Sequence, residues 1–255
     1  MLISRNILFF TAIFFLQFLC YSCCNERKGI EKGCEDNKAI NNSFFKDTLN
    51  MDDSETLLNM MKIEAVIIGD ATWMQENLSV TTFRNGDIIS QAKTNEEWQK
   101  AAQDGYPVWC FYENRENNEG KYGKLYNWYA VNDARGLAPE GWKIPSEKDW
   151  LILINKFGGI TTELVELMSI DGWEEGYGGN NISGFRAYPG GGRFWNGEFK
   201  GEKYSAYFWS STSSSHEGLK AVSFSLSNPL SMISSFNKGY GFSIRCIMDD
   251  EYNRN

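Results

Sequence analysis

The side chains best suited to binding chemistry lie between positions 171 and 203, where aromatic, amide and acidic residues alternate with glycines. Tryptophan and tyrosine provide a large, stiff contact surface with a polar tip, and loops on a rigid scaffold commonly carry binding sites. The alternative is that these aromatic residues tie a long loop to the core. We predict a ligand-binding surface from Trp173, Tyr177, Asn180, Asn181, Arg193, Phe194 and Trp195.

The same segment contains carboxylates that could serve a cation. Calcium requires six to eight oxygen ligands that converge on one point. Asp171, Glu174 and Glu175 are the candidate ligands, and Asn180 and Asn181 could complete the set. The segment could therefore hold a structural calcium ion. We expect no other metal and no organic cofactor.

Catalytic motifs are weak. His216 is the single histidine, and it lies in a serine-rich stretch typical of a loop. A Ser-His-acid site needs a nucleophile held by an oriented base, and no Gly-x-Ser-x-Gly turn accompanies this histidine. Zinc sites need clustered histidine or cysteine ligands. We therefore predict no catalytic residues and no enzymatic activity.

The elements that position the glycine-rich segment are short. Thr94 and Glu97 form a capping box that predicts one helix, and Ser146 with Asp149 predicts a second. The closing strands alternate apolar and polar residues, which indicates one buried and one wet face. We predict an α+β domain with two short helices, small antiparallel sheets and long glycine-rich loops. Four tryptophans are predicted to lie in its core: Trp98, Trp128, Trp142 and Trp150.

The N-terminus carries an export pattern. Arg5 precedes an apolar run from Ile7 to Leu19, which is shorter than a membrane-spanning helix requires. Cysteines at 20, 23 and 24 resemble a bacterial lipobox. We predict a lipoprotein signal peptide over residues 1–22, acylation of Cys23, a flexible tether over 23–61 and a folded domain over 62–250. The protein would then be lipid-anchored in the cell envelope, at the outer membrane.

The composition of the chain excludes some classes of binding partner. The chain has a formal net charge of −8, and none of its basic clusters is larger than Arg27-Lys28. This balance argues against nucleic acid and against electrostatic docking on anionic lipid. The expected partner is a glycan or an envelope or host protein, with membrane contact only through the lipid anchor.

Two cysteines lie in strand-like segments of the predicted domain. Cys110 and Cys246 would pair readily in an oxidising compartment, and such a disulfide would stabilise the fold by about 4–5 kcal/mol on the chain-entropy model. The alternative is two separate buried thiols that behave as small apolar groups. We predict the disulfide.

A resemblance to a known family rests on several ordered motifs. The stretch from Gly123 to Trp150 resembles the signature of the Fibrobacter succinogenes major paralogous domain. Further matching motifs span 73–78, 181–191, 208–212 and 241–246, so that the resemblance covers most of the predicted domain. It implies a C-type-lectin-like fold in a secreted or lipid-anchored bacterial protein. It implies no particular activity, because the family has no settled common one.

Two groups of proteins with a similar fold have known functional motifs that can be compared with this sequence. Residues 143–150 and 184–186 resemble motifs of formylglycine-generating enzymes, but only Cys246 stands where those enzymes have a copper-binding cysteine pair. The Glu-Pro-Asn and Trp-Asn-Asp motifs of calcium-dependent lectins are absent. The main hypothesis is therefore a non-enzymatic lipoprotein that binds a glycan or a protein. The alternative is a structural subunit of a surface assembly.

Overall fold

The computed structural model describes residues 63–160, 163–214, 220–227 and 232–249. These residues belong to one compact unit, Met60–Asp249. The predicted signal peptide, Cys23, the tether and His216 lie outside the described residues. None of the described helices is long and apolar enough to cross a membrane.

Helix α4 (Asn95–Asp104) begins and ends as its sequence predicts. The Thr94 side chain accepts a hydrogen bond from the Glu97 backbone at 3.2 Å, and the Glu97 carboxylate accepts one from the Thr94 backbone at 3.1 Å. This reciprocal pair satisfies two donors that helical geometry leaves open. The helix ends at Gly105, whose φ of 70° favours glycine.

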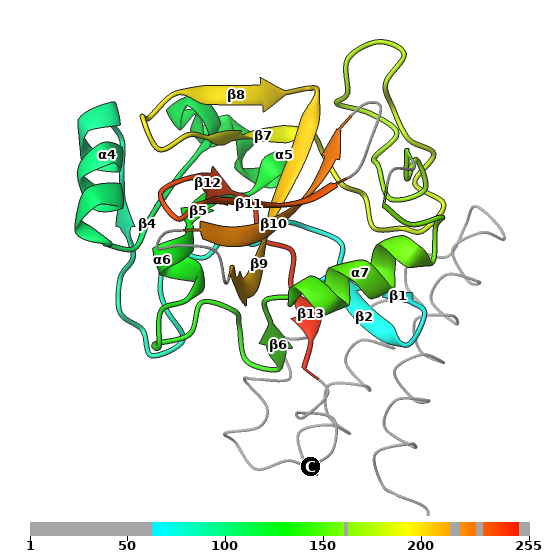
Figure 1. The fold of residues 1–255 in the computed structure, drawn as a ribbon, viewed down its shortest axis with the longest axis horizontal. Coiled ribbons are helices and arrows are strands. Elements are labelled where there is room, and N and C mark those ends of the chain that lie inside the picture. Colours follow the sequence, from blue (N-terminus) through cyan, green and yellow to red (C-terminus); the bar gives the residue numbers. More distant parts are fainter. Residues whose placement is uncertain (1–62, 161–162, 215–219, 228–231, 250–255) are drawn as a thin grey trace, which may run out of the picture. The chain divides into compact units, whose positions relative to one another are not determined.

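Helix α7 (Glu147–Asn155) repeats this arrangement with Ser146 and Asp149 as its capping box. Its apolar stripe enters the core through Trp150, Leu153 and Ile154. The remaining helical segments are single turns: the 3-10 turns Tyr112–Asn114 and Glu116–Asn118, α5 (Glu119–Tyr122) and α6 (Trp128–Val131). Figure 1 shows α4 and α7 at two separate sides of the domain. Two longer helices were predicted, and two are present among the described residues.

The smaller sheet joins the two ends of the described domain. Its strand order is β1 (Ala65–Ile68), β2 (Ala71–Met74), β13 (Ile247–Met248) and β6 (Trp142–Lys143), all antiparallel. Ile247 lies opposite both Trp73 and Lys143, so the last strand is held between the first hairpin and the signature stretch.

The larger sheet has nine strands and is mixed. Two of its pairs, β7 with β9 and β3 with β4, run parallel, so the prediction of small antiparallel sheets was only partly right. Strand β8 pairs with β7 outside the main path. The strand order is β11 (Met232–Asn237), β10 (Lys220–Ser227), β9 (Ser205–Ser213), β7 (Gly190–Arg193), β12 (Gly241–Phe242), β5 (Leu125–Asn127), β4 (Val108–Cys110) and β3 (Ser90–Gln91), with β8 at Phe199–Glu202.

Tryptophans build the interior of the domain. Trp98, Trp128, Trp142 and Trp150 are buried, as predicted. The Trp150 ring lies 4.9 Å from that of Trp73 and 5.5 Å from that of Phe208, measured between centroids. Large buried rings dominate core energetics, so these contacts fix α7 against β2 and β9.

The two cysteines of the domain do not form the predicted disulfide. Cys110 and Cys246 are both free and fully buried. Cys110 packs in the cluster around Trp98, whereas Cys246 packs in the cluster around Trp128 and Trp209. Strand alternation indicated that both would be buried, but the two side chains belong to different parts of the core.

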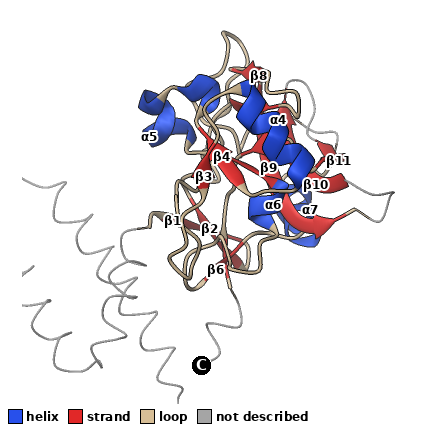
Figure 2. Ribbon diagram, turned by 90° about the vertical axis from the view of Figure 1, so that its left-hand side faces the viewer, coloured by secondary structure: helices blue, strands red, loops and turns tan. Residues whose placement is uncertain are grey.

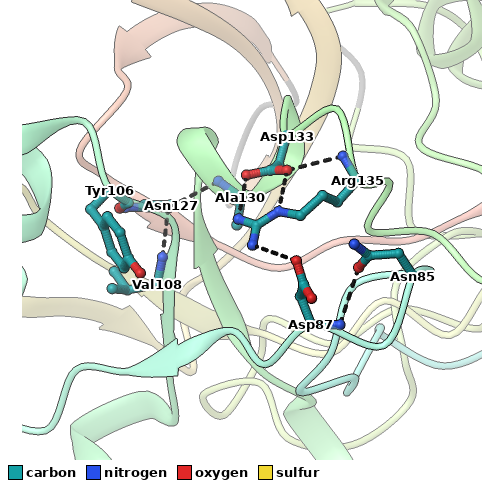
Figure 3. A network of polar contacts seen from close by, with 8 residues as sticks. All are labelled: Asn85, Asp87, Tyr106, Val108, Asn127, Ala130, Asp133 and Arg135. Atoms are coloured by element: carbon teal, nitrogen blue, oxygen red, sulfur yellow. Dashed lines mark hydrogen bonds and ion pairs between the residues drawn. The ribbon is translucent and has the colours of Figure 1, made fainter.

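A buried amide organises the signature stretch (Figure 3). The Asn127 side chain accepts hydrogen bonds from the backbone of Val108 and of Ala130, both at 3.1 Å, and donates one to the Tyr106 carbonyl at 2.7 Å. It thereby caps α6 and holds the segment leading into β4.

We expect Asn127→Ala to lower the free energy of unfolding by about 1–3 kcal/mol, because three buried backbone groups lose their partner. Urea denaturation measures this, and an unchanged midpoint would contradict it.

The same figure shows an ion cluster at the surface. The Arg135 guanidinium contacts Asp133 at 2.8 Å and Asp87 at 3.1 Å, and it lies 4.0 Å from the Phe83 ring centroid. Its hydrogen bond lowers the pKa of the Asp133 carboxyl. Both carboxylates are occupied by one arginine, so this cluster joins two loops and is no acid-base pair.

Candidate functional site: an aromatic face on the larger sheet

Four aromatic rings from separate segments of the larger sheet and its turns form one partly exposed surface, which we call the aromatic face. It consists of Phe194, Tyr207, Phe236 and Tyr240. Ring centroids lie 4.9 Å apart for Phe194 and Tyr240, 5.5 Å for Tyr240 and Phe236, and 6.4 Å for Phe236 and Tyr207. Beneath them lies the fully buried ring of Phe242, stacked on Tyr207 at 4.9 Å.

Sheet order brings these rings together. Phe194 follows β7, Tyr207 lies on β9, Phe236 lies on β11 and Tyr240 precedes β12. A turn joins β11 to β12, with the Tyr240 amide donating to the Asn237 carbonyl at 3.0 Å. Close packing of the strands depends on a small residue, since a Cβ at Gly192 would lie 2.9 Å from the Phe242 ring.

Trp195 borders the aromatic face on a hairpin turn between β7 and β8. Its side chain is 54% exposed, which is unusual for the largest apolar side chain. Two backbone hydrogen bonds close the turn: Gly197 donates to Phe194 at 2.8 Å, and Phe194 donates to Glu198 at 2.7 Å. A side chain at Gly239, next to Tyr240, would reach the Trp195 Cβ at 3.5 Å. The tryptophan therefore stands beside the aromatic face on a fixed backbone.

Arg193, which we predicted to contact ligand, braces this turn from below. It is fully buried, with its guanidinium between the rings of Trp98 and Phe199 at 4.8 and 4.6 Å. It donates to four oxygens: the carbonyls of Gly197, Ala92 and Thr94, and the side chain of Asn95. Because its donors are occupied inside the protein, it fixes the turn that presents Trp195.

One ion pair edges the aromatic face. The Lys200 ammonium lies 5.1 Å above the Phe194 ring and 3.0 Å from the Glu198 carboxylate. Both side chains are more than half exposed, so solvent screens the pair and its contribution to stability is small. The edge of the face beside Phe194 thus carries one ion pair without net charge.

Two residues of the predicted ligand-binding surface, Tyr177 and Trp173, do not belong to the aromatic face. The exposed rings of Tyr177 and Tyr204 meet at 6.4 Å, and the 174 and 203 backbones are joined by a 3.0 Å hydrogen bond. The backbone carbonyl of the exposed Ile170 would lie 3.0 Å from a Cβ at Gly178, the residue after Tyr177, and we call Tyr177, Tyr204 and Ile170 the loop patch. Trp173 is half-buried against the cluster around Trp150, and its indole donates to Ser169 at 3.1 Å. For Trp173 the structure therefore favours the alternative of a core anchor.

The amides and carboxylates of the glycine-rich segment bind other groups of the protein, most of them within the segment. Asn180 accepts a hydrogen bond from the Ile182 backbone, and Asn181 accepts one from the Arg186 backbone. Asp171 pairs with Lys121 at 2.8 Å, and Glu174 with Lys203 at 3.7 Å. Within the part of the chain that the structure describes, no group of three or more histidine, cysteine or acidic residues could hold a metal ion. The candidate calcium ligands are therefore not brought together.

Sequence reasoning missed Tyr207, Phe236 and Tyr240. Tyr207 lies in a strand that the sequence predicted, and Tyr240 lies just before another. Phe236 lies on β11, which the sequence did not predict. No local signal connects these residues with Phe194. Their proximity arises from the order and register of β7, β9, β11 and β12. A sequence window of a few residues contains no information about that order.

Comparison with known proteins gives one match. No curated protein and no solved structure matches the chain. The model of the Fibrobacter succinogenes major domain matches residues 66–248, which include both sheets, the signature stretch and the aromatic face. The chain therefore belongs to the Fibrobacter succinogenes major domain family.

Proposed function

We propose that this protein is a non-enzymatic lipoprotein of the cell envelope whose domain binds a glycan through the aromatic face. The observation that carries the proposal is Trp195, an exposed tryptophan on a turn that a buried arginine fixes, beside four partly exposed rings. A core residue has no need of such exposure. A binding residue gains from it, because a rigid ring is ordered before the ligand arrives.

Sugars suit this surface better than ions do. Pyranose rings present apolar C–H faces that stack on aromatic rings, and their hydroxyl groups can exchange hydrogen bonds with tyrosine tips. Tyr207 and Tyr240 supply such tips among the rings of the face. Beside Phe194, Lys200 and Glu198 neutralise one another. A neutral glycan is therefore the ligand class that fits best.

The proposed cellular location follows from the N-terminal sequence. Residues 1–22 would be removed as a signal peptide, Cys23 would carry the lipid, and residues 23–61 would tether the domain to the outer membrane. Both ends of the described domain belong to the smaller sheet, whereas the aromatic face belongs to the larger one.

We also propose a C-type-lectin-like fold without enzymatic chemistry. Supporting the fold are two capped helices, a hairpin that pairs with the last strand, and the long glycine-rich segment. Supporting the absence of catalysis is Cys246, which is fully buried. Burial raises the pKa of this thiol to about 12, so it is neither exposed nor ionised at neutral pH.

A second candidate function is a structural subunit of a surface assembly, for which the loop patch argues. Tyr177, Tyr204 and Ile170 are 40%, 52% and 72% exposed. Exposed apolar side chains surrounded by ion pairs are typical of a protein contact. This function would place the essential residues in the loop patch and leave Trp195 without a role.

Glycan arrays and polysaccharide pull-downs on the chain from residue 25 onward separate the two. We expect saturable binding that Trp195→Ala weakens at least about ten-fold, equivalent to about 1.4 kcal/mol. Tyr204→Ala is the matched control, because it removes an equally exposed ring from the loop patch. Unchanged circular dichroism would show that both variants fold. No binding by the folded parent protein would reject the glycan proposal, and loss of capture of an envelope protein in Tyr204→Ala alone would favour the assembly subunit.

A further inference from the structure

Strand β11 is an edge of the larger sheet as far as the structure describes it. Among the described residues, β11 pairs only with β10, in an unbroken antiparallel register from Asn237 opposite Lys220 to Met232 opposite Ser225. Figure 2 places both strands at the right-hand margin of the domain. Strand β11 therefore carries backbone donors and acceptors that the sheet itself does not use.

Natural edge strands usually carry features that prevent further pairing, such as charged residues, proline, a bulge or very short length. The other edges of this sheet have them: β3 has two residues, and β8 carries Lys200 and Glu202. Strand β11 reads Met-Ile-Ser-Ser-Phe-Asn over six residues, without charge or proline. Its first side chain, Met232, is 48% exposed.

We propose that two copies of this chain pair through β11, antiparallel, about a two-fold axis at Ser234. An antiparallel pair within one continuous sheet requires that axis to be normal to the sheet, so each residue must face a partner residue on the same side of the pleat. With the axis at Ser234, Ser234 lies opposite the partner's Ser234. Met232 then lies opposite the partner's Phe236, and Ile233 lies opposite the partner's Ser235.

This register matches side chains well. The exposed thioether of Met232 meets an aromatic ring, a favourable contact for sulfur, and this happens twice because of the symmetry. The two small serines at the axis allow the strands to approach. The chain carries a net charge of −8, which opposes non-specific association, but the pairing strand itself is uncharged. A second copy is therefore the occupant that this edge fits.

The pairing would also join the two aromatic faces. Phe236 belongs to both the edge strand and the aromatic face. A two-fold axis normal to the sheet leaves both aromatic faces on the same side. The dimer would present one wider surface and two Trp195 residues, which suits a repetitive polymer better than a single sugar. This consequence rests on the proposed function, whereas the pairing itself does not.

Cysteine cross-linking of the full chain on intact cells tests the pairing. Residues directly opposite in an antiparallel pair have Cα atoms about 4.5–5.5 Å apart, which suits a disulfide. We expect Ser234→Cys to give a reducible dimer under mild oxidation. Ser235→Cys is the matched control, because it stands opposite the partner's Ile233 and should give no more dimer than the parent chain. Equal yields from both variants, or none from Ser234→Cys, would overturn the proposal.

A charge variant provides a second readout that needs no cysteine. Ser234→Lys places two ammonium groups opposite each other at the axis, whereas Ser211→Lys places the same charge on an exposed position of β9. In sedimentation velocity of the full chain in detergent, we expect Ser234→Lys to raise the concentration for half-association at least ten-fold. Ser211→Lys should leave it unchanged. A parent chain that is monomeric throughout would overturn the pairing without affecting the glycan proposal, which the array tests separately.

Discussion

Replacing Arg245 with alanine is expected to lower the free energy of unfolding by about 4 kcal/mol, a large part of the 5–15 kcal/mol typical of a domain, because several buried acceptors lose their donor at about 1–3 kcal/mol each. The Arg245 guanidinium is fully buried. It donates to the Asn77 side chain at 2.7 and 3.1 Å, to the Met74 carbonyl at 3.3 Å, and to the Phe185 carbonyl. Its removal leaves buried acceptors from two distant segments, 74–77 and Phe185, without this donor.

Burial lowers the pKa of Arg245 to about 9, so the side chain remains charged at neutral pH. It donates hydrogen bonds to amide and carbonyl oxygens, and its guanidinium carbon lies 4.5 Å from the Phe185 ring centroid. The same guanidinium therefore connects β2, the loop before β7 and the last segment of the chain. Replacing this one side chain should therefore destabilise the whole unit and not one loop.

Urea denaturation followed by tryptophan fluorescence measures this loss. Arg186→Ala is the matched control, because the Arg186 side chain is partly exposed and pairs with Glu64 at 3.2 Å and Glu76 at 3.7 Å. We expect it to cost less than about 1 kcal/mol, as is typical of surface ion pairs. A similar loss of unfolding free energy in the two variants would show that Arg245 does not hold these segments together.

The second large effect concerns the two thiols of the domain. Burial raises the pKa of Cys110 and of Cys246 from 9.0 to about 12. At pH 8 this reduces the thiolate fraction by about a thousand-fold, and the thiolate is the reactive form. In a chain that starts after Cys24 and carries Cys34→Ser, we expect no alkylation in the native state and two alkylated cysteines after unfolding. Mass spectrometry counts them, and a native mass lower by two hydrogen atoms would reveal a disulfide instead.

The same shifts predict the behaviour of the domain at alkaline pH. Between pH 9 and 12 the unfolded chain loses the two thiol protons, whereas the folded chain keeps them. The unfolded state then binds fewer protons, so the free energy of unfolding falls as pH rises through this range. Replacing both cysteines with alanine should reduce this alkaline slope in urea titrations, even though the cavities lower stability at every pH. An identical slope would contradict the raised pKa values.

Local sequence determined the helices, the buried tryptophans and the family. The capping boxes at Thr94 and Ser146 operate within four residues, so each could be recognised without knowledge of the fold. The stripe of Trp150, Leu153 and Ile154 follows from helical periodicity alone. The ordered motifs between residues 66 and 248 likewise indicated the family that the match establishes.

Only the tertiary structure decided which side chains share a surface. The sequence grouped Phe194 and Trp195 with Trp173 and Tyr177 because they are near one another along the chain, and it assigned Arg193 to the ligand. Strand order instead joins Phe194 to Tyr207, Phe236 and Tyr240, and it buries Arg193 beneath the turn. It also separates Cys110 from Cys246. The physical reason is that strand pairing connects residues far apart in sequence through backbone hydrogen bonds that nearly any side chain permits, so local composition does not encode it.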